Sequence, residues 1–134
     1  MSTVLEAVGE YIATNSTDLT LGTNLFLSKM PESPDYCVAI FEYEGMPPIE
    51  TFGESGFSVD RPSLQIMVRA TREDYVTARD KAATLRTLIS TISNTTLSSI
   101  GILRVASLGS VMPIGVDELE RPLIVFNVDC FVGI

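Results

Sequence analysis

The run PLIVFNVDCFV, residues 122–132, predicts the clearest β-strand in the chain. Asn127 and Asp129 fall on one face of this strand together with Leu123 and Val125, and the other face is apolar throughout. The apolar face consists of Ile124, Phe126, Val128, Cys130 and Val132. Because a one-residue shift in pairing would bury Asp129, we expect the register of this strand to be tightly fixed.

Three further segments upstream have strand character. Residues 36–44 (YCVAIFEYE) form a nearly continuous β-rich run, as expected of a strand covered on both faces. Residues 63–70 (SLQIMVRA) alternate, which predicts a strand with one buried face and with Arg69 on the opposite face. Residues 102–107 (ILRVAS) predict a third strand, and residues 19–26 a short extended piece.

Two segments show the three- and four-residue spacing of amphipathic helices. The first spans residues 3–13, with Ser2 or Thr3 as the N-cap. The second spans residues 75–92 and begins after Thr71, which we expect to cap it with Asp74 as the partner carboxylate. A helix of about twenty residues is about 30 Å long, enough to cross a small sheet. The polar residues 93–96 are expected to end it.

This order of elements predicts an α+β fold in a single domain, residues 1–134. We expect a mostly antiparallel mixed sheet of about four to five strands, with an N-terminal helix and one long helix packed on it. Residues 45–61 contain prolines, glycines and acids without a clear element. They are either a long functional loop or a long β-hairpin with a mobile tip, and the sequence leaves both open.

The composition of the chain favours some classes of function and argues against others. Hydrophobic residues make up 46% of the 134 residues and the mean hydropathy is +0.29, more than a monomeric core needs, which points to subunit interfaces. The net charge of −8, without a basic cluster, argues against a direct grip on nucleic acid. No apolar run reaches 18 residues, so we expect no membrane span, and the first residues do not resemble a signal peptide.

The sequence offers little for chemistry. Histidine is absent, and a nucleophile would have to use Lys29 or Lys81 as its base. Cys37 and Cys130 lie in apolar runs and read as buried reduced thiols, with a disulfide or reactive site as the less favoured alternative. We therefore expect no catalytic residues, no cofactor and no metal, and hence no enzyme.

Residues 112–122 (MPIGVDELERP) place four charged side chains immediately before the last strand. They read either as a polar turn that leads into that strand or as an exposed charged loop that meets a neighbouring subunit. The four residues are Asp117, Glu118, Glu120 and Arg121.

Taken in order, several segments resemble the tail terminator proteins of long-tailed bacteriophages, often labelled minor capsid proteins. The resemblance runs from about Leu21 to Val132. Its parts are GTNLF (22–26), MPESPD (30–35), CVAI (37–40) with the loop GMPP (45–48), PSLQIMVR (62–69) before a helix, and the pattern G-x-D-E-x-x-R-P (115–122) before the closing strand. The pattern differs at Met46, where a second glycine is expected, and at 119–120, where a small turn residue is expected.

The resemblance implies a structural virion protein that forms a hexameric ring on the head-proximal end of the tail tube. Its partners would be copies of itself, the tail tube protein and the head–tail connector protein, with DNA passing through the lumen and assembly in the host cytoplasm. A connector or tail-completion protein is the alternative, and a small-ligand-binding α+β module is a third. Candidate contact residues are Glu50, Phe52, Glu54, Phe57, Asp60, Arg61, Asp117, Glu118, Glu120 and Arg121.

Overall fold

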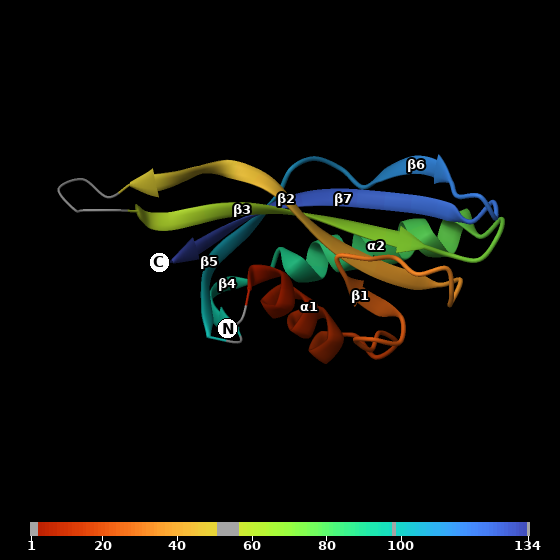
Figure 1. Ribbon diagram of the computed structural model, residues 1–134, viewed down its shortest axis with the longest axis horizontal. Helices are drawn as coiled ribbons and strands as arrows, with labels where there is room; N and C mark the ends of the chain where they lie inside the picture. The colour runs from red at the N-terminus through yellow and green to blue at the C-terminus, as the bar shows by residue number, and fades with distance from the viewer. Residues whose placement is uncertain (1–2, 51–56, 98, 134) are drawn as a thin grey trace.

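Two helices pack on one face of a curled, mostly antiparallel sheet in the computed structural model, which describes residues 3–50, 57–97 and 99–133 (Figure 1). The helices are α1 (Val4–Asn15) and α2 (Tyr75–Ile89). The α+β class is confirmed, with helices segregated from the sheet.

The sheet has seven strands in the described part of the chain, in the order β1-β2-β3-β7-β5-β4, with β6 also paired to β7. Among these strands of the described chain, the β1–β2 pair is parallel and the other pairs are antiparallel. The strands are β1 (Leu25–Leu27), β2 (Cys37–Glu50), β3 (Phe57–Arg69), β4 (Ser93–Leu97), β5 (Ile100–Ser107), β6 (Met112–Val116) and β7 (Pro122–Gly133).

Strand β7 is the centre of this sheet. One of its edges pairs with β3 from Leu123 to Gly133. Its other edge is divided, because β6 pairs with the first part of β7, up to Val125, and β5 pairs with the second part, from Val128 onward. Strand β6 consequently lies at an edge of the sheet.

The core lies between the helices and the apolar face of β7. Ile124, Phe126 and Cys130 are fully buried there, as the alternation of the sequence predicts. Strands β2 and β3 and both helices contribute the facing side chains, among them Val38, Ile40, Leu64, Ile66, Val8, Ile12, Ala82, Leu85 and Ile89. Interdigitation of these apolar groups supplies most of the stability of such a domain.

Two predicted boundaries of the helices differ from the structure. Helix α2 has 15 residues and ends at Ile89, so the single long helix is wrong. The Ser90 and Thr91 hydroxyls donate to the carbonyls of Thr87 and Leu88, which turns the chain out of the helix. Its N-cap is Asp74, not Thr71. At α1, Thr3 forms the expected cap, with Glu6 completing a capping box.

The prediction of four to five strands is too low. Residues 93–97, expected to end the long helix, form β4, and residues 112–116, expected to be part of a turn, form β6. Both strands are short and lie at sheet edges, and β6 is exposed along its whole length. An edge strand needs no buried apolar face, so neither segment was predicted as a strand.

The segment 45–61 is a hairpin arm in its described part. Strand β2 continues to Glu50 and β3 begins at Phe57, and the two strands pair with register shifts after Tyr43. Of the two alternatives, the long β-hairpin is the one found, and its arm extends well past both helices (Figure 1). Residues 51–56 lie outside the described residues.

Asp129 is buried although the sequence places it on the open face of β7. It pairs with Ser63 of β3, and its carboxylate accepts a hydrogen bond from the Ser63 hydroxyl at 2.6 Å, so burial of this side chain is not what a shift in register would cost. The face without helices is therefore partly covered by its own side chains, since Ser63 and Asp129 on it are 3% and 5% exposed. A carboxylate tolerates such a position when it has a hydrogen-bond donor.

We predict that Gly45→Ala destabilises the protein by about 1–3 kcal/mol. A Cβ at Gly45 would meet the Arg61 carbonyl oxygen at 2.0 Å, and this backbone cannot move without opening the base of the arm. Urea denaturation measures the change. Gly101→Ala is the matched control, since a Cβ there meets nothing within 4 Å; equal stability of the two variants would contradict the prediction.

Candidate interaction surface

Neither cysteine is placed for chemistry. Cys37 and Cys130 are free and fully buried, as predicted. Burial raises the pKa of Cys37, and burial together with the nearby Asp129 raises the pKa of Cys130 to about 12. A thiol that stays protonated at neutral pH is a poor nucleophile.

The described residues contain neither a metal-binding cluster nor a membrane-spanning helix. Across residues 3–50, 57–97 and 99–133, no group of three or more His, Cys, Asp or Glu side chains could hold a metal ion. No helix in that part of the chain is long and apolar enough to cross a membrane.

Two buried arginines hold the proline-rich segment 30–36 against the sheet. Arg69, at the end of β3, is only 3% exposed and donates to the carbonyl oxygens of Pro31 and Pro34, both at 2.7 Å, and of Asp35 at 3.0 Å. Arg121 is 5% exposed and reaches the same segment through the Asp35 carboxylate at 3.0 Å. We call this pair of arginines, with Asp117 and residues 31–35, the arginine clasp.

Asp117 organises the turn on the other side of the clasp. One of its oxygens accepts the backbone N–H groups of Leu119 and Arg121, and the other accepts Arg121 Nε at 2.8 Å. Arg69 approaches the same carboxylate at 4.0 Å. The turn between β6 and β7 is therefore rigid, and a buried guanidinium shared among several acceptors is stable there.

Residues 117–121 form a turn that leads into β7, in agreement with the first of the two alternatives for this segment. Arg121 differs from the second alternative, because it is buried and paired within the chain, and contact of the turn with a neighbouring subunit stays a prediction. Glu118 and Glu120 are exposed, and Glu120 forms an exposed ion pair with Arg72. These two are the exposed members of the four charged side chains in the turn, and of the two only Glu118 has no described ion-pair partner.

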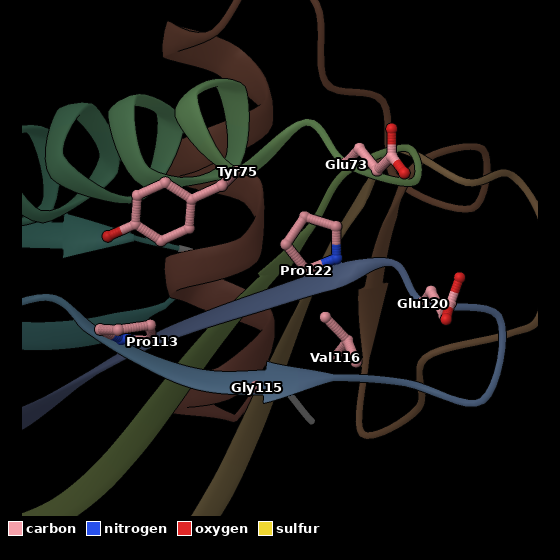
Figure 2. Close-up of a pocket in the computed structure, with 7 residues that line it drawn as sticks. All are labelled: Glu73, Tyr75, Pro113, Gly115, Val116, Glu120 and Pro122. Atoms are coloured by element: carbon pink, nitrogen blue, oxygen red, sulfur yellow. The ribbon is translucent and has the colours of Figure 1, made fainter.

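An apolar groove of about 480 Å³ runs beside the clasp, between strand β6 and the start of α2 (Figure 2). Tyr75 projects over it from α2, and Pro113, Val116 and Pro122 line it from β6 and β7. Glu73 and Glu120 lie at one end, and Gly115 forms part of the wall. The groove has few polar groups, which suits apolar packing better than catalysis.

Strand β6 presents a row of apolar side chains beside this groove. Met112, Ile114 and Val116 are 47%, 48% and 60% exposed. A sheet edge with unpaired backbone groups and exposed apolar side chains is a site at which another chain can pair or pack. The apolar residues occupy every second position of MPIGV, but the intervening Pro113 and Gly115 are typical of a turn, so the sequence analysis did not identify this strand.

The other predicted contact residues lie on the hairpin arm. Phe52 and Glu54 fall outside the described residues, and only the backbones of Glu50 and Phe57 are described. Asp60 is exposed near the base of the arm. Arg61 lies opposite β7, where its guanidinium stacks on Phe131 at 5.4 Å. The arm residues and the 117–121 turn are thus separate surfaces at the two ends of β7.

A family model described as bacteriophage tail terminator protein matches residues 11–130, which run from the end of α1 through most of β7. The chain belongs to the bacteriophage tail terminator family. No match was found among curated proteins. The resemblance given by the sequence is therefore confirmed.

Membership in the tail terminator family makes this chain a structural component of a phage tail, and so of the virion. Such a protein acts with other virion components, and the family is in general not enzymatic. The exposed β6 edge and the groove beside α2 are therefore the candidates for contact with such components.

We predict that Asp117 makes the stability of this tail terminator pH-dependent. Burial alone would raise the pKa of Asp117, but hydrogen bonds from Arg121 and Leu119 hold it below its ordinary value of 3.8. The ionised carboxylate thus stabilises the fold above the unfolded pKa, and this contribution is lost as pH falls through the folded pKa.

Asp117→Asn should lower the free energy of unfolding by about 1–3 kcal/mol near neutral pH, and the gap to the parent protein should narrow below about pH 4. Denaturation curves across this range measure it. Glu118→Gln, in the same turn but exposed, should leave the pH profile unchanged. A gap that stayed constant with pH would refute a role for the Asp117 charge.

Proposed function

We propose that this chain forms a ring that caps the tail tube at its head-proximal end, stops tube polymerisation and provides the surface for head attachment. The proposal includes a hexameric homo-oligomer, contacts with the tail tube and head–tail connector proteins, DNA passing through the lumen, and assembly in the host cytoplasm. It is supported by the family and by one structural observation, the exposed apolar edge formed by β6.

The β6 edge fits a subunit contact better than a free surface. Three exposed apolar side chains stand beside an apolar groove that Tyr75 partly covers. Cyclic rings use heterologous contacts, in which one surface of a subunit meets a different surface of the next. An edge strand with a neighbouring groove offers such a surface without any conformational change.

The rigid turn next to this edge supports the same use. The arginine clasp fixes residues 31–35 and 117–121 through buried hydrogen bonds, so the position of β6 against α2 is set before assembly. Binding then requires little ordering of loops, which lowers the entropic cost of association. The net charge of −8 suits a lumen that must release DNA.

Three measurements test the proposal together. Light scattering of the purified protein, alone and with tail tube protein, should show a closed oligomer, and adding the protein during tube polymerisation should shorten the tubes. Particles that lack the protein should carry overlong tails in electron micrographs. Filled heads without tails would instead indicate a connector or completion protein. A protein that stays monomeric both alone and with tail tube protein would contradict the proposed ring.

We predict that Val116→Asp weakens self-association at least tenfold while leaving the melting temperature nearly unchanged. Val116 is 60% exposed on β6, so a carboxylate there costs the fold little but is unfavourable once covered. Sedimentation velocity measures the association.

Ala83→Asp is the control for the charge alone, since Ala83 is exposed within α2. Equal association constants for Val116→Asp and the parent protein would exclude β6 from the interface.

A further inference from the structure

A cation–aromatic row crosses the sheet near the end of β7, on the face that carries no helix. Phe131 of β7 lies opposite Arg61 of β3 and pairs with Arg104 of β5. The two guanidinium carbons lie 5.4 and 5.6 Å from the centre of the Phe131 ring. Both arginines thus stack on one aromatic ring from the two neighbouring strands.

This row is positive and not neutralised within the described residues. Neither arginine forms an ion pair with a described carboxylate, and Arg61 Nε is buried without a hydrogen-bond acceptor there. The nearest acid along the same face of β7 is Asp129, which is buried and bonded to Ser63. A planar guanidinium with free N–H groups is well suited to bind a carboxylate.

The opposite end of β7 carries the complementary charge. Glu118 and Glu120 are exposed in the turn that leads into β7, and Glu73 is exposed in the neighbouring turn before α2. Glu120 is paired with Arg72, whereas no described cation pairs with Glu73 or Glu118. Nine residues of β-strand separate Pro122 from Phe131, a distance of about 30 Å.

We propose that the Arg61–Phe131–Arg104 row of one subunit binds Glu118 and Glu73 of the next copy of this chain. The proposal rests on the proposed ring and names the surfaces that would close it. One subunit cannot satisfy the contact within itself, because the two charged sites lie at opposite ends of one extended strand. Repeated from copy to copy, the contact is heterologous and compatible with closure by rotation.

The charge of the chain favours a second copy over DNA as the occupant. Two arginines can neutralise at most a few phosphates, and the net charge of −8 repels a polyanion. A second copy instead offers two carboxylates without a described cation partner: Glu118, on the turn that the arginine clasp holds rigid, and Glu73, on the neighbouring turn before α2. Complementary surface charges of this kind set the orientation of an encounter and make it salt-dependent.

Charge reversal in both directions tests the contact by sedimentation velocity. Arg61→Glu with Arg104→Glu, and separately Glu73→Lys with Glu118→Lys, should each weaken self-association at least tenfold. An equimolar mixture of the two variants should restore assembly, because every junction then joins opposite charges. Arg104→Glu alone, at an exposed position, should give a partial loss even if the Arg61 change perturbs the arm.

Arg79→Glu and Asp80→Lys on α2 are the controls, since each makes the same type of charge reversal at one position outside both sites; Arg79→Glu alone matches Arg104→Glu alone. Unchanged assembly in both double variants, or weak assembly in their mixture, would overturn this contact while leaving the ring itself intact. Loss of binding to duplex DNA in the arginine variant, with self-association unaffected, would assign the row to DNA instead. A parent protein that never assembles would refute the proposed function first.

Discussion

The hydrogen bonding of β7 is the constraint on which the rest of the structure depends. One edge of this strand is fully occupied by β3, and the other is divided between β6 and β5. Because the second edge is shared, β6 covers only the start of β7 and keeps one edge unpaired in the sheet. The same strand carries the charged turn at its beginning and Phe131 near its end, so the pairing also fixes the separation of these two sites.

The arginine clasp holds residues 31–35, which form no helix or strand, in place through side-chain hydrogen bonds. Residues 31–35 contain two prolines, which have no N–H to donate, and their carbonyl groups need donors from elsewhere. Arg69 supplies them, and Arg121 joins the segment to the turn before β7. Burying two guanidinium groups is costly, but each is surrounded by carbonyl or carboxylate acceptors.

The periodicity of apolar residues predicted three elements, each of which has one face in the core and one outside it. Strands β7 and β3 have a two-residue period, and helix α1 has a spacing of three and four residues. Strands β4 and β6 were not predicted. The sequence of β4, SNTTL, is polar, and that of β6, MPIGV, contains proline and glycine, as turns do. Both are edge strands, which need no buried apolar face. The turn at Asp117 and Arg121 was located, but the burial of Arg121 depends on Asp35, which is 86 residues away. Phe131 and Arg104 become neighbours only through the register of β5, which a single sequence does not specify.

The acidic character of the chain bears on how its copies can associate. Subunits of charge −8 repel one another, but at physiological salt this repulsion is screened within about 8 Å. Short-range contacts therefore decide whether a pair is stable, and the surface offers an apolar edge for this. An apolar strand alone fixes neither direction nor register, whereas charges of opposite sign at the two ends of β7 distinguish head-to-tail from head-to-head pairing. In the ring that we propose, the apolar surface would supply attraction, and the few unpaired charges would supply orientation.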